Sequence, residues 1–74
     1  MVNFKISYVD GSSITYENVT EARYVDEYGD PSVVSQEDLA FFSFPLDSDL
    51  WLYSEAGSIS ISCDGMRAIL VSVK

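Results

Sequence analysis

Apolar and polar residues alternate in the first segment of the chain. In residues 2–8, VNFKISY, the apolar positions are Val2, Phe4, Ile6 and Tyr8. A period of two is typical of a β-strand with one buried face. The alternation resumes in SITY, after an Asp-Gly pair, so the pattern predicts an antiparallel hairpin.

Register selects the turn between these two segments. A two-residue Asp-Gly turn would place Ile6 opposite a threonine. A three-residue loop, Val9-Asp10-Gly11, with its glycine in the left-handed conformation, instead places Ile6 opposite Ile14. It also places Phe4 opposite Tyr16. Because only this register keeps the apolar side chains on one face, we expect the three-residue loop.

The end of the chain, SISISCDGMRAILVSV, has the same features. A three-residue loop, Cys63-Asp64-Gly65, would set Ile59 opposite Ile69 and predicts a second hairpin. Ala68 and Leu70 add apolar character to the other face of the last segment, so we expect a central strand that is buried on both sides. The two hairpins predict one core that contains Phe4, Ile6, Ile14, Tyr16, Ile59, Ile69 and Val71.

The middle of the chain mixes several signals. TEARYVDE is typical of a third strand, YGDP of a turn and DLWLY of a buried or edge strand. SQEDLAFF favours a short helix that ends near Phe42, with Ser35 as its N-cap and Leu39 on its apolar face. The alternative is that LAFFSFP forms a strand. The fold class that follows is mostly β: one domain over residues 1–74, a small antiparallel sheet or barrel of five to six strands, with at most one short helix.

Most aromatic side chains should lie inside so small a domain. We expect a core position for Phe4, Tyr8, Tyr16, Phe42, Phe44 and Trp51. Tyr24, Tyr28 and Tyr53 stand next to acidic residues, which favours rings that are partly exposed.

Negative charge is concentrated in the middle of the chain. The net charge is −8, and the 43 residues from Tyr24 to Met66 contain nine acidic residues and no basic one. Such a surface repels nucleic acids and anionic membranes and attracts cationic partners. Direct binding to nucleic acid or to a membrane is therefore not expected.

The residues that most often carry catalysis are scarce. The chain has no histidine, which removes the usual general base and the commonest transition-metal ligand. The one cysteine, Cys63, lies next to Asp64, and a neighbouring carboxylate raises the pKa of a thiol. We expect no enzymatic activity, no cofactor and no metal site. The alternative is that Asp47 and Asp49, or Asp26 with its neighbours, hold a hard cation.

Size, charge and lack of catalytic residues together resemble the small acidic proteins that bacteriophages and mobile elements use against host defences, including anti-CRISPR proteins and DNA mimics. The resemblance is one of composition, centred on YVDEYGD, SQED and DSD. It implies that the carboxylates imitate backbone phosphates and occupy a groove lined with lysine and arginine.

We therefore expect an inhibitor that docks on the basic, nucleic-acid-binding surface of a larger protein. The predicted partner-binding residues are Asp26, Glu27, Tyr28, Asp30, Glu37, Asp38, Asp47, Asp49 and Tyr53. Two alternatives stay open: an assembly module that pairs, for instance with a second copy, through a strand edge, and a small-ligand or metal-binding barrel. The lone cysteine and the lack of a signal-like start predict a cytoplasmic location, in the host cell if the chain is phage-encoded.

Overall fold

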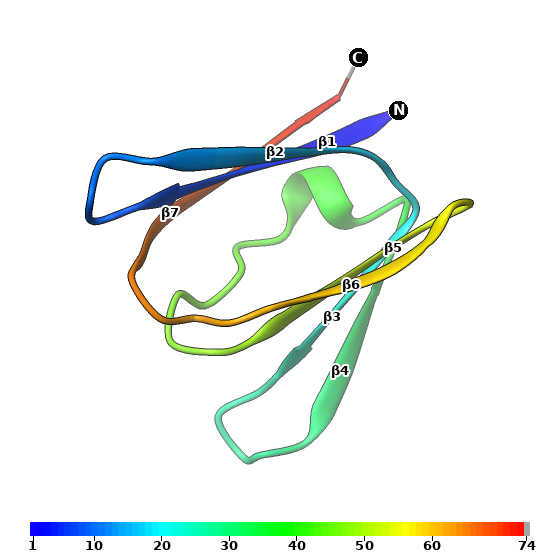
Figure 1. Cartoon of the computed structure of the whole chain (residues 1–74). Helices are drawn as coiled ribbons and strands as arrows, with labels where there is room; N and C mark the ends of the chain where they lie inside the picture. Colours follow the sequence, from blue (N-terminus) through cyan, green and yellow to red (C-terminus); the bar gives the residue numbers. More distant parts are fainter. Residues whose placement is uncertain (74) are drawn as a thin grey trace.

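The computed structural model describes residues 1–73, and strands make up most of it (Figure 1). The strands are β1 (Val2–Tyr8), β2 (Ser13–Val19), β3 (Glu21–Val25), β4 (Pro31–Ser35), β5 (Leu50–Ser54), β6 (Gly57–Ile61) and β7 (Met66–Val73). A single 3-10 turn, η1 (Leu39–Phe41), follows β4. The mostly β antiparallel fold is confirmed, although the described strands number seven, not five or six.

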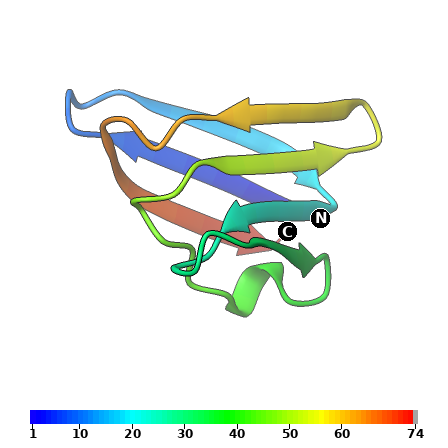
Figure 2. The ribbon, with the colours of Figure 1, turned by 90° about the horizontal axis from the view of Figure 1, so that it is seen from below.

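Two antiparallel sheets form the fold. One has three strands in the order β2-β1-β7, and the other has four in the order β4-β3-β5-β6. The sheets lie over one another, with β2 and β6 on one flank and β7 and β4 on the other (Figure 2). Two packed sheets with free edges make an open sandwich and not a closed barrel.

The first hairpin has the predicted register. Ile6 lies opposite Ile14, and Phe4 lies opposite Tyr16. The N–H of Tyr8 donates to the carbonyl of Ser12 at 2.9 Å, so the loop between them has three residues. Gly11, with φ of 91°, provides the left-handed conformation that this loop needs.

The second predicted hairpin is wrong. β6 pairs with β5, with Ile59 opposite Leu52, and β7 pairs with β1, with Ile69 opposite Ile6. Residues 62–65 do turn, but they carry the chain from the four-stranded sheet to the three-stranded sheet. Ile59 and Ile69 still lie on the inner faces of the sheets, because the predicted and the observed pairings both place them there.

Two further predictions about elements are corrected. β7 is an edge strand and not a central one, and its residues Ala68 and Leu70 are exposed. Ser35 does not cap a helix, because it is the last residue of β4 and lies opposite Glu21. The helical signal of SQEDLAFF is reduced to η1, which Asp38 precedes without a side-chain hydrogen bond to the turn.

The segment after β4 closes one flank of the sandwich. Leu39 of η1 is completely buried. Phe44 packs edge-on against Phe4 with 5.3 Å between ring centroids, and Phe42 lies 5.2 Å from Tyr24. Residues 36–46 therefore run along the flank of β7 and β4, whereas no segment of residues 1–73 runs in this way along the flank of β2 and β6 (Figure 2).

Every strand and η1 contribute to the core. The buried hydrophobic residues are Val2, Phe4, Ile6, Val19, Ala22, Val34, Leu39, Leu50, Leu52, Ile61 and Met66. Tyr16, Ile69 and Val71 pack against this cluster as predicted. Ile14 and Ile59 do not, because they face inward on the open flank and remain 48% and 44% exposed.

Trp51 also departs from the prediction. Its neighbours Leu50 and Leu52 are buried, so the alternation of the strand turns Trp51 to the outer face of the four-stranded sheet, where it is half-buried. Tyr53 shares this face and lies under the guanidinium of Arg23, 4.8 Å from the ring centroid. Arg23 also pairs with Glu21 at 2.9 Å.

Candidate functional site: the acidic end

Four loops meet at one end of the sandwich. β3 ends where β5 begins and β6 ends, since Tyr24 lies opposite Leu50, which lies opposite Ile61. The turn after β3 (26–30), the approach to β5 (45–49) and the crossover after β6 (62–65) therefore lie together (Figure 2). The β1–β2 loop joins them, because the N–H of Val9 donates to the carbonyl of Gly65 at 2.9 Å.

Most of the predicted acidic residues come together here. Asp26, Glu27, Asp30, Asp47 and Asp49 lie in these loops. Two more carboxylates, which were not in the predicted set, belong to the same end: Asp10 and Asp64, each placed by an Asp-Gly turn. We call the loops 9–11, 26–30, 45–49 and 62–65 the acidic end.

Glu37 and Asp38 do not belong to this group. They follow the last residue of β4, whereas the turn of residues 26–30 precedes its first residue, so the length of the strand separates them from the acidic end (Figure 2). Glu17, Glu21 and Glu55 are also distant from it. The sequence predicted one acidic face with seven carboxylates. The structure brings five of these seven together, at the acidic end.

Asp26 fixes the turn after β3. One of its carboxylate oxygens accepts from the N–H of Tyr28 at 2.9 Å and from the N–H of Asp30 at 3.0 Å. The other accepts from the hydroxyl of Ser32 at 3.2 Å. This is the usual role of aspartate in a turn, where the side chain takes the place of a backbone partner. Asp26 therefore contributes to folding as well as to charge.

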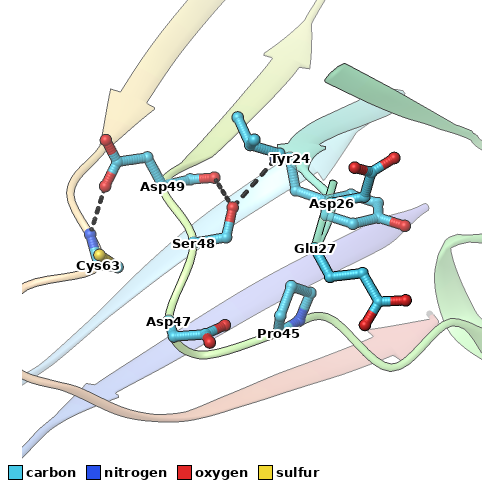
Figure 3. A pocket seen from close by; sticks show the side chains of 9 residues that line it. Tyr24, Asp26, Glu27, Pro45, Asp47, Ser48, Asp49 and Cys63 are labelled. Atoms are coloured by element: carbon cyan, nitrogen blue, oxygen red, sulfur yellow. Dashed lines mark hydrogen bonds between the residues drawn. The ribbon is translucent and has the colours of Figure 1, made fainter. Parts of the chain in front are cut away.

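Asp49 ties the approach of β5 to the crossover (Figure 3). Its carboxylate accepts from the N–H of Cys63 at 3.0 Å. This bond, together with a hydrogen bond from the Cys63 thiol, lowers the pKa of Asp49. The hydroxyl of Ser48 donates to the carbonyl of Asp49 and accepts from the N–H of Val25, both at 3.0 Å, so β3 is joined to the same loop.

Cys63 has the opposite shift. Its hydrogen bond to the Asp49 carboxylate raises the pKa of the thiol, and partial burial and the charge of Asp64 act in the same direction. The direction agrees with the prediction from the sequence, but the main cause is Asp49 and not the adjacent Asp64. A thiol held in its neutral form is a poor nucleophile.

Of the other five carboxylates of the acidic end, Asp10 accepts from the N–H and the hydroxyl of Ser12, and four are unengaged. Within residues 1–73, none of the side chains of Glu27, Asp30, Asp47 and Asp64 accepts a hydrogen bond. Glu27 and Asp47 lie on either side of Pro45 (Figure 3). They border an open hollow of about 850 Å³, whose other lining residues include Tyr24 and Val25. Free carboxylates beside apolar side chains such as Val25 and Pro45 can receive a lysine or arginine side chain, which has an aliphatic stem and a charged head.

The two tyrosines proposed as anchors have different positions. Tyr28 is at the tip of the acidic end and is 81% exposed. Tyr53 lies opposite Glu21, near the other end of the sheet, and contacts Arg23. Only Tyr28 can therefore contact a partner together with the acidic end.

No polar or charged residue among residues 1–73 is fully buried. Over the same residues, no group of three or more Asp, Glu or Cys side chains is arranged to hold a metal ion. The described chain also has no helix long and apolar enough to cross a membrane.

Comparison with known protein families, characterised proteins and solved structures finds no match to this chain.

Proposed function

We propose that the protein is a non-catalytic interaction protein whose acidic end docks on the basic, nucleic-acid-binding surface of a larger protein. The observation that carries this proposal is the set of four unengaged carboxylates, Glu27, Asp30, Asp47 and Asp64, on loops that other hydrogen bonds hold in place.

Preorganised loops favour binding, because less conformational entropy is lost when the partner docks. Asp26 and Asp49 supply this order through bonds to backbone N–H groups. Tyr28 adds an exposed aromatic ring beside the charges, and tyrosine is among the residues that contribute most to binding at interfaces. Charge would then steer the encounter, and Tyr28 would supply contact area.

The chemistry of the site supports a nucleic-acid-binding partner. Lysine and arginine side chains that bind phosphates also accept carboxylates as partners, often with two hydrogen bonds from one arginine. A surface that binds DNA or RNA presents many such side chains together, as a cluster of carboxylates requires.

Zero-length carbodiimide cross-linking in a host lysate tests the proposal, because it joins carboxylates only to amines in direct contact. We expect cross-links from Glu27, Asp30, Asp47 or Asp64 to lysines of a nucleic-acid-binding protein, and their loss when duplex DNA or RNA is added. Cross-links confined to Glu37, Asp38 and Glu55, or cross-links indifferent to nucleic acid, would contradict it.

A further inference from the structure

The flank of the sandwich between β2 and β6, which we call the open flank, is a second surface that could bind a partner. It lies between the edge strands β2 and β6 and forms a cleft of about 340 Å³ lined by residues that include Tyr16, Leu52 and Ile59. Ile14 and Ile59 belong to the inner faces of the two sheets and are nevertheless 48% and 44% exposed. On the other flank, Phe42 and Phe44 fill the corresponding position.

β6 is the least protected of the four strand edges. β4 begins with Pro31, which has no N–H to offer, and β7 is flanked by residues 40–46, which line a cleft beside it. β2 carries a bulge at Asn18, where φ is 58°. Proline, bulges and covering segments are the usual means of blocking an edge. Residues 57–61, GSISI, have none of them and no charge.

The hydrogen-bonding groups at this edge can be assigned from the register. Ser54 lies opposite Gly57 across a two-residue turn. Such a turn is closed by a hydrogen-bonded pair, and the pairs alternate along an antiparallel ladder. The backbones of Gly57, Ile59 and Ile61 therefore bond to β5, whereas those of Ser58 and Ser60 face the free edge.

The acidic residues around the β6 edge determine which kind of strand can bind to it. Glu17 borders the cleft, Glu55 precedes β6 and Asp64 follows it, so both ends of an uncharged strand are acidic. A second copy of the chain would bring these carboxylates against its own. An extended segment with basic residues at its ends would instead be complementary.

We propose that the β6 edge accepts one extended strand from a partner protein, with apolar side chains at alternate positions and lysine or arginine at both ends. The backbone of this strand bonds to Ser58 and Ser60, and its apolar side chains cover Ile14 and Ile59 in the cleft. This site shares only Asp64 with the acidic end, and its hydrogen-bonding groups and apolar residues lie on other elements, so either proposal can fail without the other.

The test uses the synthetic peptide Lys-Val-Thr-Val-Thr-Val-Lys, with blocked termini, added to the isotope-labelled full chain. We expect saturable NMR shift changes in β6 with a dissociation constant below about 1 mM. Amide exchange at Ser58 and Ser60 should slow about tenfold at saturation. The same peptide with glutamate in place of both lysines should bind at least about tenfold more weakly.

Two variants keep the test independent of folding. Ser60→Pro removes an N–H that β5 does not use, and we expect affinity for the peptide to fall about three- to tenfold. Ile59→Thr should also weaken binding, whereas Leu70→Thr, at a more exposed strand position on β7, should leave affinity unchanged.

Three results would overturn the proposal. Shift changes confined to the acidic end would mean that the peptide binds by charge alone. Protection of Ser58 and Ser60 that rises with protein concentration in the absence of peptide would assign the edge to a second copy. Unchanged affinity in both Ser60→Pro and Ile59→Thr would show that β6 is not the binding strand.

Discussion

Asp10, Asp26 and Asp49 each accept a hydrogen bond from a backbone N–H, whereas Glu27 and Asp47 accept none in the described part of the chain. Residues of the same charge therefore have different roles. The first group orders the loops of the acidic end, and the second is available to a partner. Replacing Asp26 would disturb the turn as well as the charge, so it is unsuitable for a test of binding.

The pH dependence of stability should report the role of Asp49. Its pKa is lowered in the folded chain, so its contribution to the unfolding free energy is complete above the unfolded pKa and is lost as the pH falls through the folded value. We expect Asp49→Asn to be less stable than the wild type at pH 7 and the difference to close as the pH falls below about 4.

Thermal unfolding followed by circular dichroism at pH 7 and pH 3 measures this difference. Asp47→Asn is the matched control, because it removes the same charge from the same loop without removing a hydrogen bond. A difference for Asp49→Asn that does not change with pH would contradict the role given to this carboxylate.

Gly11 is a second residue with a definite structural requirement. Its φ of 91° is a conformation that residues with a Cβ, and above all β-branched ones, rarely adopt. We expect Gly11→Val to lower the unfolding free energy by about 1–3 kcal/mol in urea titrations. Ser13→Val, two residues later in an extended strand, should change it by less than about 0.5 kcal/mol. Equal effects of the two substitutions would show that the turn does not depend on glycine.

The position of Trp51 shows that the type of a residue predicts its burial less well than the alternation of its strand does. Its size favours a core position, but Leu50 and Leu52 have the opposite phase in the same strand and are the residues that are buried. The alternation in DLWLY contained this signal. The type of the aromatic residue obscured it.

At the scale of elements, local pattern was sufficient for β1 and β2. The hairpin is closed by three residues, and the competing register would have placed Ile6 opposite a polar residue. For β6 and β7 the same kind of turn gave the wrong pairing. Ile59 and Ile69 reach the inner face in either arrangement, so the choice of neighbouring strand depends on contacts between distant segments, such as Ile69 with Ile6.

The segment after β4 shows tertiary packing overriding a local helical preference. Ser35 is held in β4 by pairing with Glu21, which leaves only residues 39–41 in a helical turn. The aromatic residues that follow then extend along the flank. Their packing, and not helix propensity, determines the course of the chain.

We expect this segment to hold the two sheets together. Phe44 contacts Phe4 and lies 6.1 Å from Tyr24, so Phe44→Ala should lower the unfolding free energy by about 2–3 kcal/mol, somewhat less than for a fully buried phenylalanine. Phe41 is 88% exposed, and Phe41→Ala should change it by less than about 0.5 kcal/mol. Urea unfolding followed by tryptophan fluorescence compares the two variants. A small effect of Phe44→Ala would mean that the flank is not stabilised by these rings.

At the scale of the whole molecule, strand direction divides the acidic residues. The turn after β3 and the approach to β5 lie at one end because β3 and β5 are antiparallel neighbours, and β4 carries Glu37 and Asp38 to the other. Composition predicted an acidic surface, but it could not place Glu37 away from Glu27, nor could it bring in Asp10 and Asp64. Those positions depend on the topology of the sheets.

The central claim is that the acidic end, and not the total charge, binds a basic partner. The most direct test compares two triple variants that each remove three negative charges: Glu27→Gln/Asp30→Asn/Asp47→Asn at the acidic end, and Glu37→Gln/Asp38→Asn/Glu55→Gln elsewhere. The measurement is the association rate with the cross-linked partner at two salt concentrations. We predict that the first variant associates about tenfold more slowly and loses most of the salt dependence, whereas the second stays close to the wild type. Equal slowing of both variants would contradict the claim, because it would show that only net charge matters.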